Sequence, residues 1–264
     1  MPRRRNAPEL TSVDHVRSFD GTQIAYAVKG SGPAVLLLHG FGADHVLNWA
    51  RPGIIDALVA SGRRVIATDA RGHGASDKPH DPDRYAGDAM VRDVQAVLDH
   101  LGIERVDVVG YSMGAMVAAR LVPAEPRTRC LVLGGVGATV TPPRTGGRAP
   151  EAIAASLLAD DVSTIDNLAG KAFREFADFT GADRRALAAL SRSTALRFPV
   201  RFEAITVPTL VIAGDADTLI KAPRELPDRL PLARLTMVSG DHLTAMYDPA
   251  FSHALVEFLE EAHA

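Results

Sequence analysis

Short apolar runs alternate with segments of helical periodicity along most of the chain. In the first half the runs are AVLLLH (34–39), RVIATD (64–69), VDVVG (106–110) and RCLVLGG (129–135). The segments with helical patterns lie between them, at roughly 46–60, 84–101 and 113–122. Fully apolar strands that alternate with helices are typical of a parallel sheet covered on both faces, so the pattern predicts the α/β class.

The pattern extends the sheet at both ends. Residues 13–29, VDHVRSFDGTQIAYAVK, look like two alternating strands, and Asp20-Gly21 between them is a strong hairpin signal. After residue 205 the alternation resumes with PTLVIAG (208–214), a helix near 222–230, ARLTMVS (233–239) and a terminal helix near 248–262. We therefore predict a mostly parallel, doubly wound sheet with an N-terminal antiparallel hairpin.

Residues 136–205 break this rhythm. The segment opens with VGATVTPPRTGGRAP and continues with helical patterns and no clear strand. We predict a helical cap insertion at 136–205 in a core domain formed by 1–135 and 206–264. Phe173, Phe176 and Phe179 recur every three residues and so form one stripe of a helix. This stripe either packs the insertion onto the body or lines an apolar pocket, and both functions can apply to different rings.

Composition narrows the class of protein. The 264 residues are 47% hydrophobic and 23% charged, as in ordinary globular proteins, and the net charge of −3 gives no basic field for nucleic acid. No apolar run approaches the ~20 residues that span a bilayer, and the start, MPRRRNAPEL, lacks the apolar region of a signal peptide. A single cysteine, Cys130, excludes an internal disulfide framework. We expect a cytoplasmic protein without membrane or nucleic-acid partners, and no feature implies a metal or other cofactor.

The stretch VVGYSMGAM (108–116) places a serine between two glycines where a strand becomes a helix. Gly-x-Ser-x-Gly is weak alone, but this strand-to-helix context is the one that a nucleophile elbow requires. Side chains at Gly110 and Gly114 would clash in such a tight turn. The turn would strain Ser112, expose its hydroxyl and aim the N–H of Met113 at developing negative charge.

These features together resemble the α/β-hydrolase superfamily, over roughly residues 13–262. The resemblance rests on HGFG (39–42), DARGHGAS (69–76), GYSMG (110–114) and a late Asp and His. Within the superfamily the chain is most similar to the small esterase, lactonase and non-haem haloperoxidase-type serine hydrolases. The resemblance implies the α/β-hydrolase fold and a Ser-His-Asp triad.

The resemblance also selects the partners of Ser112. The chain order Ser, Asp, His leaves His242, in a loop just after the last predicted strand, as the base. The loop GDADT (214–218) offers Asp215 and Asp217, and the family spacing Gly-x-x-Asp selects Asp217 as the acid, although Asp215 stays an alternative. We interpret Asp241, adjacent to His242, as a solvated or capping residue.

The resemblance assigns the oxyanion hole to backbone N–H groups of Phe41 and Met113. His39 precedes the nucleophile and is interpreted as structural, holding its loop. The loop that begins at Asp69 and Arg71 is interpreted as a hydrogen-bonded structural turn, in which these two residues are candidates to pair.

Serine at position 112 argues against haloalkane dehalogenase and epoxide hydrolase chemistry, because those relatives place an aspartate there. We predict a hydrolase that cleaves a small ester, lactone or related acyl compound through an acyl-enzyme. The alternatives are a carbon–carbon bond hydrolase of the aromatic ring-cleavage type, and a triad-containing ligand receptor with little turnover. The substrate and the oligomeric state do not follow from the sequence.

Overall fold

The computed structural model describes residues 13–138, 148–195 and 200–262. One eight-stranded sheet has the order β1-β2-β4-β3-β5-β6-β7-β8. The pairs β1–β2 and β2–β4 are antiparallel and the others are parallel, which confirms the predicted sheet with its N-terminal hairpin. The strands are β1 (Asp14–Arg17), β2 (Gln23–Lys29), β3 (Ala34–Leu38), β4 (Arg64–Thr68), β5 (Val106–Tyr111), β6 (Thr128–Gly134), β7 (Thr209–Gly214) and β8 (Ala233–Val238).

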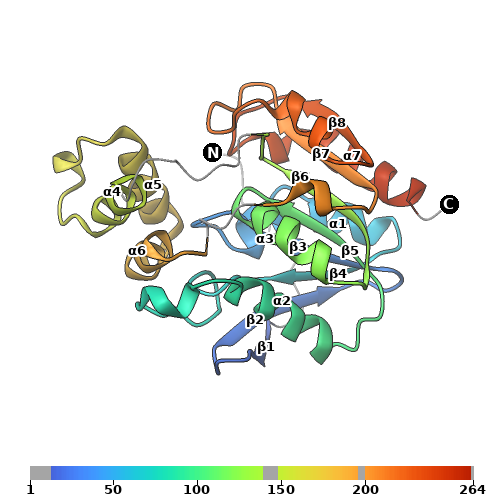
Figure 1. The fold of residues 1–264 in the computed structure, drawn as a ribbon, viewed down its shortest axis with the longest axis horizontal. Helices are drawn as coiled ribbons and strands as arrows, with labels where there is room; N and C mark the ends of the chain where they lie inside the picture. The colour runs from blue at the N-terminus through green and yellow to red at the C-terminus, as the bar shows by residue number, and fades with distance from the viewer. Residues whose placement is uncertain (1–12, 139–147, 196–199, 263–264) are drawn as a thin grey trace, which may run out of the picture.

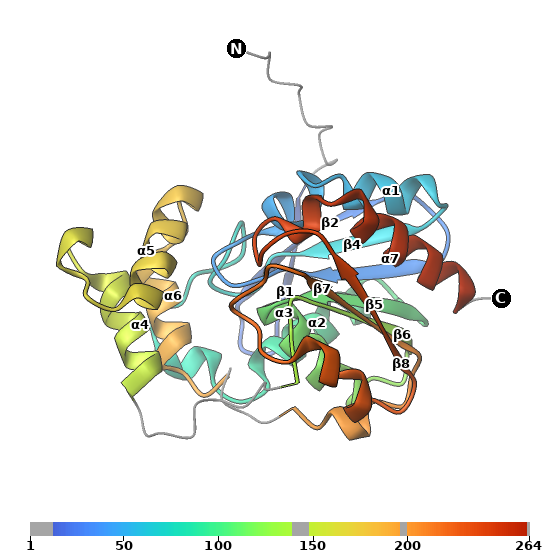
Figure 2. The same cartoon turned by 90° about the horizontal axis from the view of Figure 1, so that it is seen from above.

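Helices cover both faces of this sheet. Helices α1 (Ile54–Ala60) and α7 (Pro249–Glu261) lie on one face, and α2 (Ala89–His100) and α3 (Met113–Leu121) lie on the other (Figure 1, Figure 2). Neighbouring residues of β5 point to opposite faces, so Val108 joins the core cluster of α2 and α3 whereas Val109 joins that of α1 and α7. Burial on both faces explains why these strands are continuously apolar.

In the described part of the chain between β6 and β7, three α-helices lie beside the sheet rather than on it (Figure 1). They are α4 (Arg148–Leu158), α5 (Leu168–Thr180) and α6 (Arg184–Arg192), and we call them the cap helices. They share a small apolar cluster of their own that includes Ala154, Leu157 and Leu187. The predicted boundaries at 136 and 205 remain a prediction, because 139–147 and 196–199 lie outside the described residues.

The cap helices are fastened to the body near the N-terminus of α6. His80, in the loop after β4, lies with its Nε2 3.0 Å from the Asp183 Oδ2. The same Asp183 caps α6 by accepting hydrogen bonds from the backbone N–H groups of Arg185 and Ala186. The 3₁₀ turn η2 (Pro82–Tyr85) also contacts α6.

Glycine and proline shorten or divide the helices that we predicted. The helix expected at 46–60 divides into a π-helical turn, η1 (Val46–Ala50), and α1, because Pro52 intervenes and Gly53 has a φ of 82°. The helix expected at 84–101 begins only at Ala89, after Gly87 with its φ of 66°.

The helix predicted near 222–230 is wrong. Two short 3₁₀ turns stand there, η6 (Pro223–Glu225) and η7 (Pro227–Arg229). Pro227 lacks the backbone N–H that a continuous α-helix would bond to residue 223, and Ala222 has a φ of 51°, outside the right-handed helical region. The remaining short turns are η3 (Val122–Ala124), η4 (Val162–Thr164), η5 (Phe202–Ala204) and η8 (Ala245–Tyr247).

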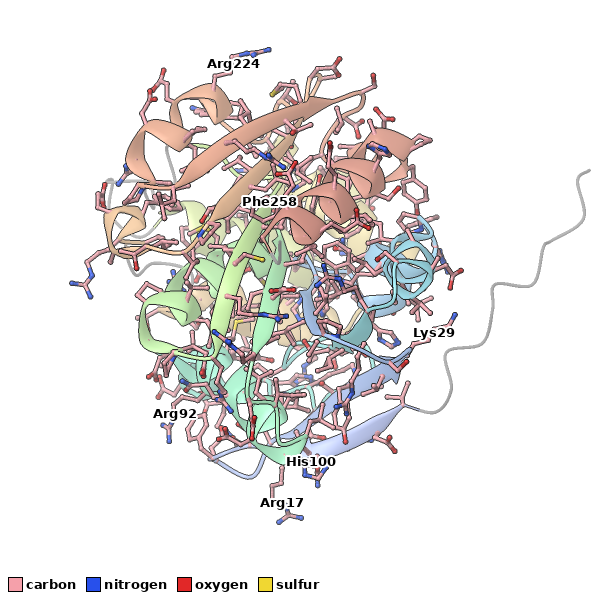
Figure 3. All side chains as sticks on the ribbon, turned by 90° about the vertical axis from the view of Figure 1, so that its right-hand side faces the viewer. Arg17, Lys29, Arg92, His100, Arg224 and Phe258 are labelled. Carbon is pink, nitrogen blue, oxygen red and sulfur yellow. The ribbon has the colours of Figure 1, made fainter. Side chains whose placement is uncertain are left out.

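The side of the molecule opposite the cap helices carries outward-pointing charged side chains, among them Arg17, Arg92 and Arg224 (Figure 3). Phe258 of α7 instead lies in the core, beneath the guanidinium of Arg234 at 5.3 Å from its ring centroid. None of the helices in the described part of the chain has the length and apolar character to cross a membrane.

Candidate active site

Ser112 stands at the turn between β5 and α3 in a strained conformation. Its φ of 51° and ψ of −113° are rarely adopted by a residue with a side chain. The two flanking glycines permit this turn: a Cβ at Gly110 would lie 2.4 Å from the Gly114 carbonyl oxygen, and one at Gly114 would lie 2.0 Å from the Leu38 oxygen. The sequence motif therefore forms the predicted tight strand-to-helix turn, which we call the elbow, and these clashes explain both glycines.

The elbow holds the Ser112 hydroxyl beside an imidazole and a carboxylate. His242 Nε2 lies 2.9 Å from Ser112 Oγ, and His242 Nδ1 lies 2.7 Å from Asp217 Oδ2. Because a carboxylate only accepts, Nδ1–H donates to Asp217 and Nε2 is free to accept the serine proton. The three residues come from loops after β5, β7 and β8, which open at the same edge of the parallel sheet.

The Asp217 side chain is fully buried and is held from its other side as well. Its Oδ1 accepts hydrogen bonds from the backbone N–H groups of Leu219 at 2.9 Å and Ile220 at 3.3 Å. These bonds fix the carboxylate plane so that Oδ2 faces the imidazole. Such an acid keeps one tautomer and one orientation of the histidine.

The neighbouring aspartates bind other groups. Asp215 Oδ1 accepts a hydrogen bond from the backbone N–H of Gly240. Asp241 caps its own turn, where its Oδ1 accepts from the N–H groups of Leu243 and Thr244. The structure thus brings Asp217, and neither of the other two, within hydrogen-bond distance of His242.

Tyr111 supports His242 through the backbone of that residue. Its hydroxyl donates a 2.8 Å hydrogen bond to the backbone carbonyl of His242, and the two rings lie 5.5 Å apart. Burial, together with the charges of Asp217 and Asp241, raises the pKa of Tyr111, so the hydroxyl stays protonated and keeps donating. Sequence reasoning did not find this contact, because the residue before the serine carries no motif.

The HGFG loop after β3 passes next to the elbow. A Cβ at Gly40 would lie 3.5 Å from the Ser112 Cβ. Among the described residues, the backbone N–H groups of Phe41 and Met113 have no hydrogen-bond acceptor. Two such donors near a serine hydroxyl are able to bind an anion.

The body of the protein fixes this loop through the backbone N–H and carbonyl groups of Gly40. The N–H of Gly40 donates to Asn48 Oδ1 at 2.8 Å, and its carbonyl accepts from His39 Nδ1 at 2.8 Å. His39 Nε2 accepts from the N–H of Ala70, so both ring nitrogens hold backbone, in agreement with the structural role predicted for His39. Burial lowers the pKa of His39 and keeps it neutral, as these bonds require.

Asn48 is a second residue that sequence reasoning missed. Its Nδ2 donates to Met246 Sδ at 2.6 Å, so it joins the HGFG loop to the segment that follows His242. The sequence signal that could have indicated this role is a polar residue, Asn48, next to the apolar Trp49; both side chains are buried in the structure. Its meaning depends on a partner 198 residues away.

The pairing considered between Asp69 and Arg71 is wrong. Asp69 Oδ1 binds His45 Nδ1 at 2.8 Å, and its Oδ2 accepts from the N–H of Ala75. Arg71 turns the other way and pairs with Asp93 at 2.5 Å and Asp20 at 3.0 Å. The predicted role of the loop as a hydrogen-bonded turn agrees with these contacts.

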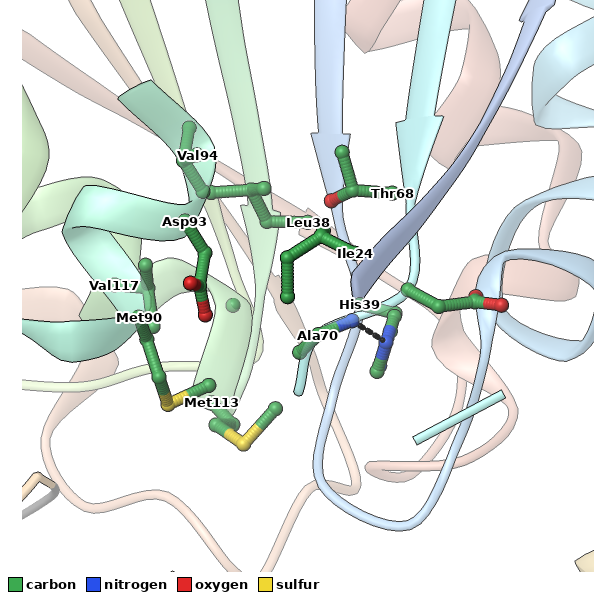
Figure 4. Close-up of a pocket in the computed structure, with 12 residues that line it drawn as sticks. Ile24, Leu38, His39, Thr68, Ala70, Met90, Asp93, Val94, Met113 and Val117 are labelled. Carbon is green, nitrogen blue, oxygen red and sulfur yellow. Dashed lines mark hydrogen bonds between the residues drawn. The ribbon is translucent and has the colours of Figure 1, made fainter. Parts of the chain in front are cut away.

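A small cavity lies on the inner side of the elbow. Its volume is about 20 Å³, and its lining combines apolar side chains with His39 and Asp93 (Figure 4). Figure 4 shows Met113 and Met90 at one end and the bond between His39 and the Ala70 N–H at the other. Such a volume holds about one water molecule and is too small for an acyl substrate.

Known proteins share this architecture. The family model described as "alpha/beta hydrolase fold" matches residues 33–159. Epoxide hydrolase 2 of Siraitia grosvenorii is 39% identical over 110 residues, which are 41% of this chain and 34% of that protein. The chain thus spans about a third of the length of the curated relatives it matches.

Solved structures match over nearly the whole chain. A hydrolase from Pseudomonas aeruginosa PA01 is 27% identical with a TM-score of 0.73, and the match covers 95% of this chain and 99% of that one. An esterase from Exiguobacterium antarcticum is 23% identical with a TM-score of 0.75, covering 93% and 98%. The chain thus has the α/β-hydrolase fold, and it is similar to α/β hydrolases in the segment that the family model matches and in overall structure.

Proposed function

We propose that this protein is a serine hydrolase that cleaves a small ester, lactone or related acyl compound. The observation that carries the proposal is the position of His242, whose two ring nitrogens bind Ser112 and Asp217 at 2.9 and 2.7 Å. A serine hydroxyl needs this base to become a nucleophile, and the base needs this acid to hold its tautomer.

The proposed reaction has two halves. Ser112 Oγ attacks the substrate carbonyl carbon while its proton moves to His242 Nε2, and the N–H groups of Phe41 and Met113 stabilise the oxyanion. The imidazolium then gives its proton to the leaving alcohol, which leaves an acyl group on Ser112. Water, deprotonated by His242, attacks this ester and releases the acid, and Ser112 recovers its proton.

Serine at position 112 bears on the choice among the activities that the relatives suggest. Opening an epoxide by the route considered above needs a carboxylate nucleophile that forms an alkyl ester. A serine alkoxide would instead form an ether, which hydrolysis does not reverse. We therefore infer an acyl substrate, even though some relatives are named epoxide hydrolases.

The test is a panel of phenyl esters of increasing acyl length, with one dienone beside them, assayed with wild type and Ser112→Ala. We expect ester turnover in wild type and a loss of at least about 10⁴-fold in kcat for the variant, since the nucleophile is removed. The matched control is Ser163→Ala, which changes an exposed serine in η4, between α4 and α5. This variant should keep full activity.

Other results would replace the proposal. Ester turnover that survives in Ser112→Ala would contradict it. Turnover of the dienone alone would favour a carbon–carbon bond hydrolase. One equivalent of phenol released in a burst, with negligible turnover afterwards, would favour a ligand receptor.

A further inference from the structure

The side chain of Phe41 points from the HGFG loop to the cap helices. Its ring lies 5.4 Å from the ring of Phe173 in α5, at an interplanar angle of 83°. This is the edge-to-face arrangement that aromatic pairs prefer. Phe41 packs against both the main core cluster and the cluster of the cap helices, so it joins the two.

The next residue of the loop is in contact with α5 as well. Gly42 has a φ of 72°, and a Cβ there would lie 3.1 Å from Phe176 Cδ1. The ring of Phe176 therefore packs directly on the loop backbone. Phe179, the third member of the predicted stripe, is 76% exposed and takes no part in this contact.

The two ends of the loop thus have different supports. The body holds the N–H of Gly40 through Asn48 and its carbonyl through His39. The cap helices hold Phe41 and Gly42 through two rings of α5. The Phe41 N–H, which is proposed to bind the oxyanion, belongs to the same peptide as the Gly40 carbonyl. The body therefore holds this peptide on its Gly40 side through His39, and the cap helices hold it on its Phe41 side.

We propose that Phe173 is a positioning residue for the oxyanion hole, and that α5 acts through it on the rate of acylation. This inference rests on the proposed function. A donor displaced from the oxyanion loses part of its stabilisation, and complete loss of one such donor costs about 10²–10³-fold in kcat. The cap helices therefore influence the reaction of every ester, including those too small to touch them.

This role differs from that of a pocket wall in a way that kinetics can measure. A wall residue contacts the acyl chain, so its loss affects long substrates and leaves the smallest one unchanged. A residue that positions the oxyanion donor affects the transition state of all substrates, because every tetrahedral intermediate carries the same oxyanion. The dependence of the rate loss on substrate size therefore distinguishes a pocket-wall residue from a positioning residue.

The experiment compares Phe173→Ala with Phe179→Ala, a matched loss of the same side chain from the same helix. Both variants and the wild type are assayed on phenyl acetate and on phenyl octanoate. For Phe173→Ala we expect kcat to fall about tenfold on both esters, with KM for phenyl acetate changed by less than about threefold. Phe179→Ala should keep wild-type kcat on phenyl acetate. Phe173→Tyr keeps the ring and should restore most of the rate.

Two results would overturn the inference alone: a Phe173→Ala variant with wild-type kcat on phenyl acetate, or a Phe173→Tyr variant as slow as Phe173→Ala. If Phe173→Ala does not fold cooperatively, Phe173→Leu keeps the apolar volume without the ring edge, and wild-type kcat in that variant would overturn the inference equally. A wild-type protein that hydrolyses neither ester would overturn the proposed function and this inference with it.

Discussion

At the scale of single residues, Asp215 and Asp217 lie in one loop but bind different groups. Asp217 faces the imidazole of His242, whereas Asp215 holds the N–H of Gly240. We predict that Asp217→Asn lowers kcat by about 10⁴-fold, because an amide can impose the wrong histidine tautomer. Asp215→Asn keeps an oxygen for Gly240 and should stay within a few-fold of wild type. Steady-state rates that fell equally in the two variants would contradict this assignment.

The hydroxyl of Tyr111 supports His242 without touching the reacting atoms. Tyr111→Phe keeps the ring but leaves the His242 carbonyl without its 2.8 Å hydrogen bond. We expect a loss of about 1 kcal/mol in the free energy of unfolding and a several-fold fall in kcat. Urea unfolding and ester hydrolysis measure the two effects. Tyr247→Phe, at a half-exposed position, is the control and should change neither.

The part of the site that could be predicted is the part that the sequence marks with motifs. A local motif indicates Ser112, and the family resemblance indicates Asp217 and His242. The structure brings the three together, while their catalytic roles remain a prediction. Asn48 and the pairing of Asp69 with His45 depend on contacts between distant segments, which no local pattern carries.

At the scale of elements, the elbow needs the close approach of α3 to the end of β3. We predict that Gly114→Ala destabilises the protein by several kcal/mol or prevents folding, because its Cβ would lie 2.0 Å from the Leu38 carbonyl oxygen. Gly102→Ala is the contrast: its Cβ meets nothing within 4 Å, and only its φ of 59° costs about 1 kcal/mol. Thermal unfolding of the two variants separates a clash from backbone strain, and equal melting temperatures would contradict the clash.

The strands were predictable and several helices were not, for one physical reason. Each central strand is buried on both faces, so its apolar run marks its ends within a residue or two. The segments at 46–60 and 222–230 also show helical spacing, but Pro52 and Pro227 interrupt the backbone hydrogen bonds of a continuous helix. The hydrophobic periodicity of a segment indicates which face is buried, but it does not indicate whether the helical hydrogen bonds are continuous.

At the scale of the whole molecule, buried neutral histidines link stability to pH. Burial lowers the pKa of His73 from 6.5 to about 3, and burial lowers that of His39 as well. The unfolded chain therefore takes up a proton at His73 near pH 6.5 that the folded protein does not bind until about pH 3. His73 thus contributes stability that falls as the pH drops through this window, by up to about 1.4 kcal/mol per pH unit, and His39 contributes in the same direction.

Urea unfolding between pH 4 and 8 tests this linkage. We expect the free energy of unfolding to decrease on acidification from pH 6.5, and His73→Asn to weaken that dependence because it removes one of the protons. The asparagine amide can still donate to the Arg71 carbonyl, as His73 Nδ1 does. His253→Asn, on the exposed side of α7, should leave the slope unchanged. A slope unaffected by His73→Asn would contradict the argument.

The hydrogen bond from Asn48 to Met246 joins segments that are far apart in the sequence, and this separation affects the order of events during synthesis of the chain. On a ribosome, the segment with the serine emerges well over a hundred residues before the one with the histidine. Until the segment with His242 docks, a nascent chain carries a Ser112 hydroxyl without its histidine partner. Synthesis from the amino end would thus delay the proposed acylation of Ser112 until that segment has left the ribosome.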